Sequence, residues 1–222
     1  KTKEEILKSF DVPAKMKIFT YEGEKDTIMK PTDSIIYYKH MLQTGMMAME
    51  PRSGHIKAWV GGVNYKYFQY DHVGQGARQV GSTFKPFLYA TAIEQLGMSP
   101  CDSIIDSYFT MPKGKWGIDK DWSPKNSDGN YRGTTTLQKA LANSINTVSA
   151  KLIDRVGPKA VVDMAKELGV TSDIPEQPSI ALGAVDITVE QMVGAMSTFA
   201  NQGVYVKPTF IIKIEDKNGV VI

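Results

Sequence analysis

The stretch Gly81–Pro86 (Gly-Ser-Thr-Phe-Lys-Pro) places a serine and a lysine three residues apart at the start of an apolar segment. From its phenylalanine onward, apolar residues recur at the three- and four-residue spacing of an amphipathic helix, and Gly97 is a natural stop. Proline is tolerated only near the beginning of a helix, so Pro86 ties the helix start to about Ser82. Because residues three apart share one face, Ser82 and Lys85 come within reach of each other.

Ser82 and Lys85 suit nucleophilic catalysis. A serine hydroxyl needs a neighbouring base to take its proton during attack. Burial disfavours a charged ammonium, so a buried Lys85 can have a pKa near neutrality and serve as that base. The positive end of the helix favours the alkoxide and the oxyanion that follows. The same pair also fits a serine helix cap beside a solvated lysine, so the motif alone is weak.

A second polar motif, Asn143–Thr147 (Asn-Ser-Ile-Asn-Thr), interrupts a helical pattern about sixty residues later. Serine and asparagine both favour helix ends, so one interpretation of Ser144 and Asn146 is a helix terminator followed by an N-cap. The other is a second hydroxyl that relays a proton and an amide that holds a substrate carbonyl or Lys85.

Composition excludes several classes of function. The 222 residues have a net charge of +2, and their Lys and Arg residues are dispersed, so we expect no nucleic-acid or membrane-surface binding by this segment. The single cysteine, Cys101, rules out an internal disulfide and is expected to be a small buried hydrophobe. His40, His55 and His72 are scattered without metal-ligand spacing. We therefore predict no metal and no cofactor.

The start of the sequence indicates a longer parent protein. No apolar run reaches the length of a membrane span, and no signal-peptide pattern is present. The first residue is Lys1 and not Met. We expect a piece of a longer chain whose targeting signal and any membrane anchor lie upstream.

Short-range patterns predict the elements before Gly81–Pro86. We expect a hairpin from Met16 to Met29 and a helix of about three turns capped by Thr32–Ser34. A second hairpin is expected from Met46 to Val60, around the turn Glu50–Gly54. The aromatic run Tyr65–Tyr70 is expected to pack a loop onto the core rather than bind a ligand.

After Gly97 come about thirty-five residues rich in Gly, Pro, Asp and Lys, and loops of that length are uncommon unless they serve a site. Thr188 and Gln191 predict a capping box for a helix that ends at Gly203. The remaining expected elements are interrupted helices from the cap Thr136 to Val156, a helix from Gly157-Pro158 to Gly169, and a last hairpin with strands Phe210–Ile214 and Val220–Ile222 around Asp216–Gly219.

Ser82-x-x-Lys85 followed by Ser144-x-Asn146 resembles the first two motifs of the penicillin-recognising serine acyltransferases, which include penicillin-binding proteins and serine β-lactamases. The surroundings look like the transpeptidase domain of class A, bifunctional penicillin-binding proteins from about Asp33 to Gly203. The blocks that carry this resemblance are Arg78–Phe87, Met49–Gly54 with Val60–Gly62, Pro124–Asn126 with Tyr131–Gly133, and Ala181–Gly183.

The resemblance implies an α+β fold of the penicillin-binding protein and serine β-lactamase type, with an antiparallel sheet flanked by helices. The Met46–Val60 hairpin would supply the first two strands of that sheet. We expect residues 1–32 to be a linker with an N-terminal hairpin, and residues 33–222 to be a partial transpeptidase domain that is incomplete in this chain.

The resemblance also implies a reaction. Ser82 would attack the penultimate D-Ala carbonyl of a peptidoglycan stem peptide, expel the last D-Ala and form an acyl-enzyme. An amine of a neighbouring stem peptide would then close the cross-link, and β-lactams would block Ser82 by mimicking D-Ala-D-Ala. Lys85 would be the general base, Ser144 the proton relay and Asn146 the partner of substrate and lysine. The backbone N–H of Ser82 would be one oxyanion donor.

One departure from the family pattern is large. The third motif, Lys-Thr-Gly or Lys-Ser-Gly, does not occur in this sequence, and in the family it lies beyond the point where this chain stops. We therefore predict that the 222 residues alone are inactive. The implied partners are stem peptides, β-lactams and the remainder of the same protein, with its glycosyltransferase domain and third motif. The implied location is the extracytoplasmic (periplasmic) side of a bacterial inner membrane, with a single-pass anchor upstream.

Two alternatives stay open. A hydrolase such as a D,D-carboxypeptidase would pass the acyl group to water, whereas a class A β-lactamase needs a deacylating Glu-x-x-Leu-Asn that neither Glu167 nor Glu190 provides. A β-lactam sensor or scaffold would acylate without turning over peptide. The four motif residues, Ser82, Lys85, Ser144 and Asn146, argue against a relic site.

Overall fold

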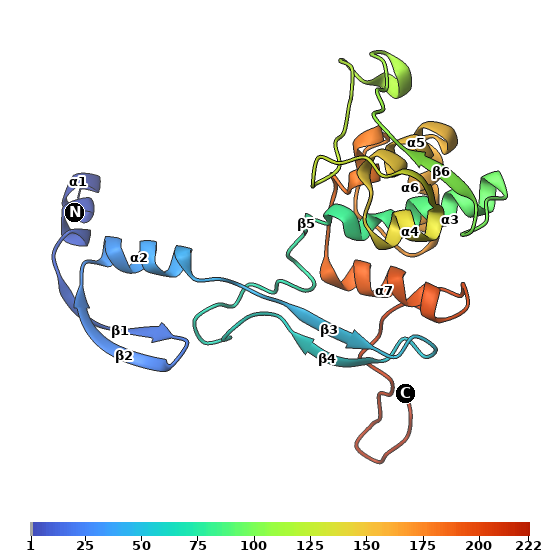
Figure 1. The fold of residues 1–222 in the computed structure, drawn as a ribbon. Helices are drawn as coiled ribbons and strands as arrows, with labels where there is room; N and C mark the ends of the chain where they lie inside the picture. The colour runs from blue at the N-terminus through green and yellow to red at the C-terminus, as the bar shows by residue number, and fades with distance from the viewer. Residues whose placement is uncertain (1) are drawn as a thin grey trace.

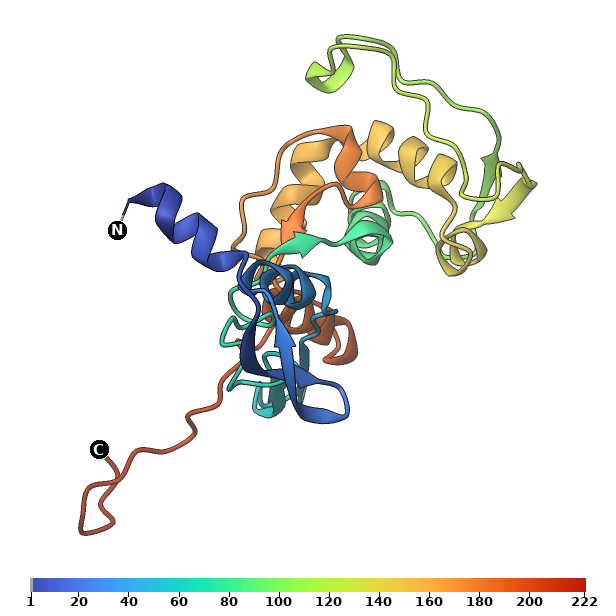
Figure 2. The same cartoon turned by 90° about the vertical axis from the view of Figure 1, so that its left-hand side faces the viewer.

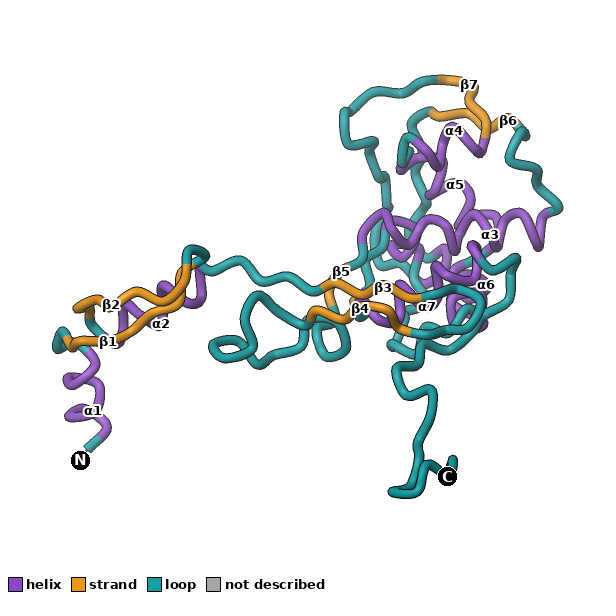
Figure 3. Tube along the Cα trace, turned by 90° about the horizontal axis from the view of Figure 1, so that it is seen from below, coloured by secondary structure: helices purple, strands orange, loops and turns teal. Residues whose placement is uncertain are grey.

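The computed structural model describes residues 2–222. It consists of a small N-terminal module at one end, a body of packed helices at the other, and a strand hairpin with loops between them (Figure 1). The same separation is visible from below (Figure 3). No helix among the described residues has the length and apolar character that a membrane crossing requires.

The N-terminal module is a two-stranded hairpin with one helix on either side in the chain. Its elements are α1 (Lys3–Phe10), β1 (Ala14–Thr20), β2 (Gly23–Met29) and α2 (Pro31–His40). β1 and β2 pair antiparallel, from Ala14 opposite Met29 to Thr20 opposite Gly23, so the predicted first hairpin is confirmed.

The predicted cap of α2 is wrong, although the helix is present. The N-cap is Lys30, which makes no side-chain cap, and Pro31 occupies the first turn. Proline is favoured there because its fixed φ suits the helix and its missing N–H is not needed. Thr32 and Ser34 therefore lie inside the helix, where the Ser34 hydroxyl donates to the Pro31 carbonyl at 2.8 Å.

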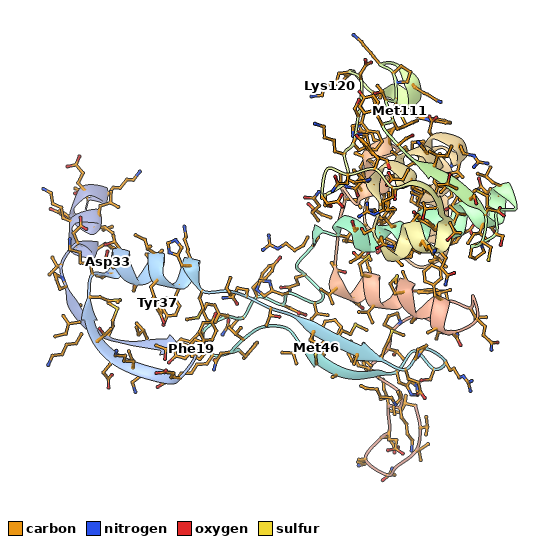
Figure 4. The ribbon with its side chains drawn as sticks, viewed as in Figure 1. Phe19, Asp33, Tyr37, Met46, Met111 and Lys120 are labelled. Carbon is orange, nitrogen blue, oxygen red and sulfur yellow. The ribbon has the colours of Figure 1, made fainter. Side chains whose placement is uncertain are left out.

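Aromatic contacts attach this module to the loop that follows β4. Phe19 of β1 stacks on Tyr67 with 5.3 Å between ring centroids, and Tyr38 of α2 meets Phe68 edge-on at 5.7 Å. The Tyr67 hydroxyl donates to the Glu24 carboxylate at 2.6 Å. Within the module, Tyr37 reaches from α2 towards the hairpin, where its hydroxyl donates to the Phe19 carbonyl (Figure 4).

The aromatic run thus packs a loop as predicted, but onto the N-terminal module and not onto the helical core. Tyr67 and Phe68 make these contacts, whereas Tyr65 and Tyr70 remain 78% and 52% exposed. Burial of aromatic surface needs a partner brought by the tertiary fold, which local sequence does not reveal.

The second predicted hairpin is confirmed as β3 (Met46–Met49) and β4 (Ile56–Val60), paired antiparallel from Met46 opposite Val60. Helix α7 (Val189–Ala200) packs against β3 and lies between this hairpin and the helical body (Figure 1). The Thr188 side chain caps α7 by accepting the Gln191 N–H at 3.3 Å.

The capping box predicted for α7 is wrong in its second half. The Gln191 side-chain oxygen accepts the N–H groups of Thr171 and Ser172, each at 2.9 Å. It therefore ties the segment after α6 to α7 instead of returning to its own helix start. α7 ends with Asn201 as its C-cap, two residues before the predicted stop.

The helical body surrounds α3 (Lys85–Leu96), which is preceded by a 3-10 turn, η1 (Gly81–Phe84), and ended by Gly97 in the left-handed region. α3 packs against α4 (Leu137–Ala142), α5 (Asn146–Val156), α6 (Pro158–Glu167) and the 3-10 turn η3 (Pro178–Leu182) (Figure 2). The centre of this core is fully buried and includes Phe84, Phe87, Leu88, Leu152 and Ile153.

Two short strand pairs were not predicted. β6 (Ser103–Asp106) and β7 (Gly133–Thr136) pair antiparallel at the ends of the long loop, and β5 (Arg78–Gln79) pairs with β8 (Asp186–Ile187). The loop between β6 and β7 contains the 3-10 turn η2 (Lys115–Gly117). Figure 4 places Lys120 at its outer end, whereas Met111, which is buried and paired with Trp122, lies nearer its base.

Two further predictions need correction. The last hairpin forms only around its turn: the Asp216 N–H donates to the Val220 carbonyl at 2.8 Å, the Ile222 N–H donates to the Ile214 carbonyl at 3.0 Å, and an isolated bridge joins Glu215 to Val221, whereas the two predicted strands do not form. A two-stranded ribbon without a packed face is marginal, and this segment extends away from the body (Figure 2). Cys101 is exposed and not buried, because it lies in the turn that connects α3 to β6.

We expect Tyr67→Ala to loosen the N-terminal module. The change removes a stacked ring and a hydrogen bond to a carboxylate, so hydrogen exchange of the β1–β2 amides should accelerate about tenfold. Tyr65→Ala is the matched control, because Tyr65 is largely exposed. Equal exchange in both variants would contradict the docking described above.

Candidate active site

Lys85, the first residue of α3, lies at the centre of the candidate site with only 1% of its surface exposed. Its Nζ donates three hydrogen bonds: to the Ser144 carbonyl at 2.7 Å, the Ser144 hydroxyl at 2.9 Å and the Asn146 Oδ1 at 2.7 Å. An ammonium has three donors. The charged form of Lys85 is therefore fully paired by two residues of the α4–α5 connection.

The α4–α5 connection aims these oxygens by its backbone shape. Ser144 has a φ of +52°, which is uncommon for a residue other than glycine and clusters at functional sites. Its N–H donates to the Leu141 carbonyl at 2.9 Å, which closes the end of α4. Its own carbonyl and hydroxyl then both reach Lys85.

Asn146, the first residue of α5, is oriented by a second contact. Its Nδ2 donates to the Lys125 carbonyl at 2.9 Å, so its Oδ1 is left facing Lys85. Asn146 therefore holds the lysine, which is one of the contacts expected for its amide, and the N-cap of α5 is Ile145 and not Asn146. The proton-relay role of Ser144 stays a prediction.

Burial changes the acid–base behaviour of Lys85. It lowers the pKa of the ammonium to about 8, because removal from water penalises the charged form. At this pKa about a tenth of the lysine is neutral at pH 7, which is a workable population for a base.

Ser82 lies on η1, one turn before Lys85, and is exposed. The predicted α-helix start at Ser82 is wrong by three residues, since α3 begins at Lys85 with Pro86 in its first turn. A helix begun at Ser82 would need the N–H that Pro86 lacks, for a bond to the Ser82 carbonyl. The structure closes the turn instead with the Lys85 N–H on that carbonyl.

Among the described residues, the Ser82 hydroxyl has no hydrogen bond to Lys85, whose three donors are all engaged elsewhere. The backbone N–H of Ser82 likewise donates to no backbone carbonyl of residues 2–222. Ser82 is thus an exposed residue in the turn directly before the helix that carries the lysine.

The segment that enters η1 is held by residues 183–187. The Val80 N–H donates to the Val185 carbonyl at 3.0 Å, and the Gly81 N–H to the Gly183 carbonyl at 3.1 Å. Gly183 has a φ of +73°, and a Cβ there would lie 1.8 Å from the Gly81 carbonyl oxygen. Only glycine fits this position, which contacts Gly81, the residue before Ser82.

The structure therefore brings Lys85, Ser144 and Asn146 together and places Ser82 one turn away on η1, which leads directly into α3. It also shows support that sequence reasoning missed: Asn126 and Asp106 lie behind Asn146. Asn126 belongs to one of the quoted blocks, whereas Asp106 had no signal in the sequence. Within residues 2–222, no group of three or more His, Cys, Asp or Glu side chains could hold a metal ion.

Comparisons with known proteins identify a family. The family described as "Penicillin binding protein transpeptidase domain" matches residues 44–221, and "Penicillin-binding protein middle domain" matches residues 1–42. Penicillin-binding protein 1A of Aquifex aeolicus is 39% identical over 184 residues, which are 82% of this chain and 24% of that protein. Penicillin-binding protein 1A of Neisseria flavescens is 37% identical over 180 residues, or 81% of this chain and 22% of that protein.

Solved structures show the same likeness. Penicillin-binding protein 1A from Haemophilus influenzae superposes with a TM-score of 0.75 at 28% identity, covering 93% of this chain and 29% of that one. The PonA1 protein from Mycobacterium tuberculosis, in complex with penicillin V, shares the fold with a TM-score of 0.70 at 24% identity, covering all of this chain and 60% of that one.

The chain belongs to the family of penicillin-binding protein transpeptidase domains. The predicted α+β fold of this family is confirmed. The chain spans about a quarter of the length of the curated relatives that it matches.

We expect Gly183→Ala to disturb the segment that carries Ser82. The new methyl group would overlap the Gly81 carbonyl, so hydrogen exchange at Val80 and Gly81 should accelerate by tenfold or more. Gly203→Ala is the matched control, because Gly203 also has a positive φ but has nothing within 4 Å of the added Cβ. The control isolates the backbone strain of roughly 1–2 kcal/mol from the clash. Similar exchange in both variants would contradict the close contact.

Proposed function

We propose that this chain carries the acyl-transfer site of a peptidoglycan D,D-transpeptidase that β-lactams inhibit covalently. Ser82 is the nucleophile, Lys85 the general base, Ser144 the proton relay, and Asn146 the partner of lysine and substrate. The observation that carries this proposal is the dry Lys85 ammonium, held by Ser144 and Asn146 at the start of the helix that follows Ser82.

The first half of the reaction makes an ester. Neutral Lys85 takes the Ser82 proton while the Ser82 Oγ forms a bond to the penultimate D-Ala carbonyl carbon. The bond from that carbon to the nitrogen of the last D-Ala then breaks, and the leaving amine receives a proton through Ser144. The Ser82 N–H, which makes no backbone bond in the described residues, supports the developing oxyanion.

The second half reverses these roles. An amine of a neighbouring stem peptide attacks the ester carbon, loses a proton to the base, and releases the Ser82 oxygen, which regains its proton. Ser144 contacts the Nζ of Lys85, so it can pass protons between the lysine and the departing or arriving nitrogen.

The three acceptors around Lys85 explain how the base is restored. As an ammonium, Lys85 donates to all three oxygens. As a neutral amine it has two hydrogens and a lone pair, so one acceptor is released and the lone pair can turn towards Ser82. Desolvation favours the neutral form, while the oxygens stabilise the ammonium that each proton transfer produces.

The family supports the wider assignment. The named relatives are penicillin-binding proteins 1A, and the chain covers about a quarter of each. We therefore propose that it works as part of a bifunctional cell-wall synthase on the periplasmic face of a bacterial inner membrane, anchored upstream. Its partners are stem peptides, β-lactams, a glycosyltransferase domain and a segment with the third motif. The division into residues 1–32 and residues 33–222 stays a prediction, and its boundary falls within α2.

Ser82 is expected to be the residue that a fluorescent penicillin labels in the intact protein. Labelling should disappear in Ser82→Ala and persist in Thr83→Val, whose native hydroxyl donates to the Val80 carbonyl at 2.6 Å. Peptide mass spectrometry locates the adduct. Label on another residue, or full labelling of Ser82→Ala, would exclude Ser82 as the nucleophile. Residues 1–222 alone should label poorly, because the second oxyanion donor and the substrate-binding strand lie with the third motif.

The acylation rate should rise with pH between 6 and 9, because only neutral Lys85 accepts the proton. With a pKa of about 8, half of the maximum is expected near pH 8. Lys85→Arg should slow acylation by about 100-fold or more, since a guanidinium does not deprotonate in this range. Stopped-flow acylation at several pH values measures both effects. A flat profile, or an arginine variant within tenfold of wild type, would exclude Lys85 as the base.

A further inference from the structure

Asp106 is a buried carboxylate that the reaction above does not use. It is the last residue of β6, and its side chain is fully buried. It accepts hydrogen bonds from the Asn126 Nδ2 at 2.9 and 3.1 Å, from the Arg132 backbone N–H at 2.9 Å, and from the Thr147 hydroxyl. The nearest cation, the Arg132 guanidinium, lies 3.8 Å away.

The carboxylate decides which way the Asn126 amide points. An ionised carboxylate only accepts hydrogen bonds, so Asn126 must present its NH₂ to Asp106. The same NH₂ donates to the Asn130 carbonyl at 2.8 Å. The Asn126 Oδ1 therefore faces the other way and accepts the N–H groups of Asn146 at 3.0 Å and Thr147 at 3.2 Å.

These two N–H groups belong to the first turn of α5, whose donors have no partner inside the helix. The N-cap residue, Ile145, offers no side-chain acceptor. Asn126 supplies the missing acceptor from a distant part of the chain, and it thereby holds the backbone of Asn146. The Asn146 Oδ1 is the end of this series and binds the Lys85 Nζ at 2.7 Å.

The charged state of Asp106 agrees with this arrangement. Burial by itself pushes the pKa of the carboxyl up, but hydrogen bonds from Thr147, Asn126 and the Arg132 backbone outweigh it, and the pKa is lowered. The carboxylate is thus ionised, and purely an acceptor, throughout the pH range in which Lys85 titrates.

We propose that Asp106 is a positioning residue for acyl transfer: by orienting Asn126 it fixes the start of α5 and so places the Asn146 oxygen on Lys85. This inference rests on the proposed function, in which Lys85 is the base. Asp106 touches neither Lys85 nor any group in which bonds change, and it acts through two intervening asparagines.

The first test is acylation of the intact protein by a fluorescent penicillin, measured against pH. Asp106→Ala leaves Asn126 free to turn, so acylation should slow by tenfold or more. Lys85 also loses an acceptor that stabilises its charged form, so its pKa falls further and the midpoint of the pH profile moves to lower pH. Asp106→Asn keeps an acceptor oxygen and should stay within threefold of wild type.

Leu152→Ala is the control for lost stability alone. Leu152 is fully buried on the same helix, α5, and its truncation lowers stability without touching the hydrogen-bonded series. Its acylation rate and pH midpoint should match wild type. The inference is overturned if Asp106→Ala acylates within threefold of wild type, or if its midpoint does not move. It is also overturned if Leu152→Ala loses as much activity at an equal fall in melting temperature.

If Asp106→Ala does not fold, exchanging the carboxylate and the amide between positions 106 and 126 tests the positioning role instead. Asn126→Asp sets two carboxylates against each other and should abolish rapid acylation. Adding Asp106→Asn restores a donor–acceptor pair and leaves residue 126 an acceptor for α5, so the rate should recover at least tenfold. Recovery stays partial because the Asn130 carbonyl loses its donor. No recovery overturns the inference.

The two proposals fail differently. If wild-type protein is not labelled at Ser82, the proposed function itself is wrong. If wild type is labelled and Asp106→Ala behaves like it, only the positioning role is lost.

Discussion

The desolvated ammonium of Lys85 is the interaction on which the rest of the site depends. Burial lowers its pKa to about 8, yet its three hydrogen bonds keep the charged form tolerable in a dry interior. A buried cation without such partners would be costly to the fold. The same oxygens that make the lysine acceptable for stability are the ones that let it gain and lose a proton.

The body of helices is arranged to keep that position dry. α3 lies among α4, α5, α6 and η3, so its first residue is enclosed even though Ser82, one turn earlier, stays exposed. η1 contacts the Gly183 backbone so closely that no side chain fits between them. Ser82 and Lys85, the proposed nucleophile and base, therefore lie one turn apart but differ sharply in exposure.

Behind the lysine, the long loop between α3 and α4 has a structural purpose. It supplies Asp106, Lys125 and Asn126, whose hydrogen bonds orient Asn146 and the start of α5. The length of the loop predicted that it serves the site. Its contribution is to orient Asn146 through hydrogen bonds. The N-terminal module, in contrast, is attached through the aromatic contacts of the loop after β4 and leaves the site untouched.

Local sequence determined what depends on neighbours in the chain: the helices around Lys85, the interruption at Ser144, the hairpin turns and the motif residues. Tertiary structure alone decided the pairs β5–β8 and β6–β7, the exposure of Cys101, the docking of Tyr67 on Phe19, and the place of Asp106. The start of α3 at Lys85 follows from the missing N–H of Pro86 and is therefore local. The physical reason is the distance along the chain between the residues that interact. Periodicity, caps and turns are governed by residues a few positions apart, whereas burial, strand pairing and the orientation of a buried amide depend on partners that only the folded chain brings together.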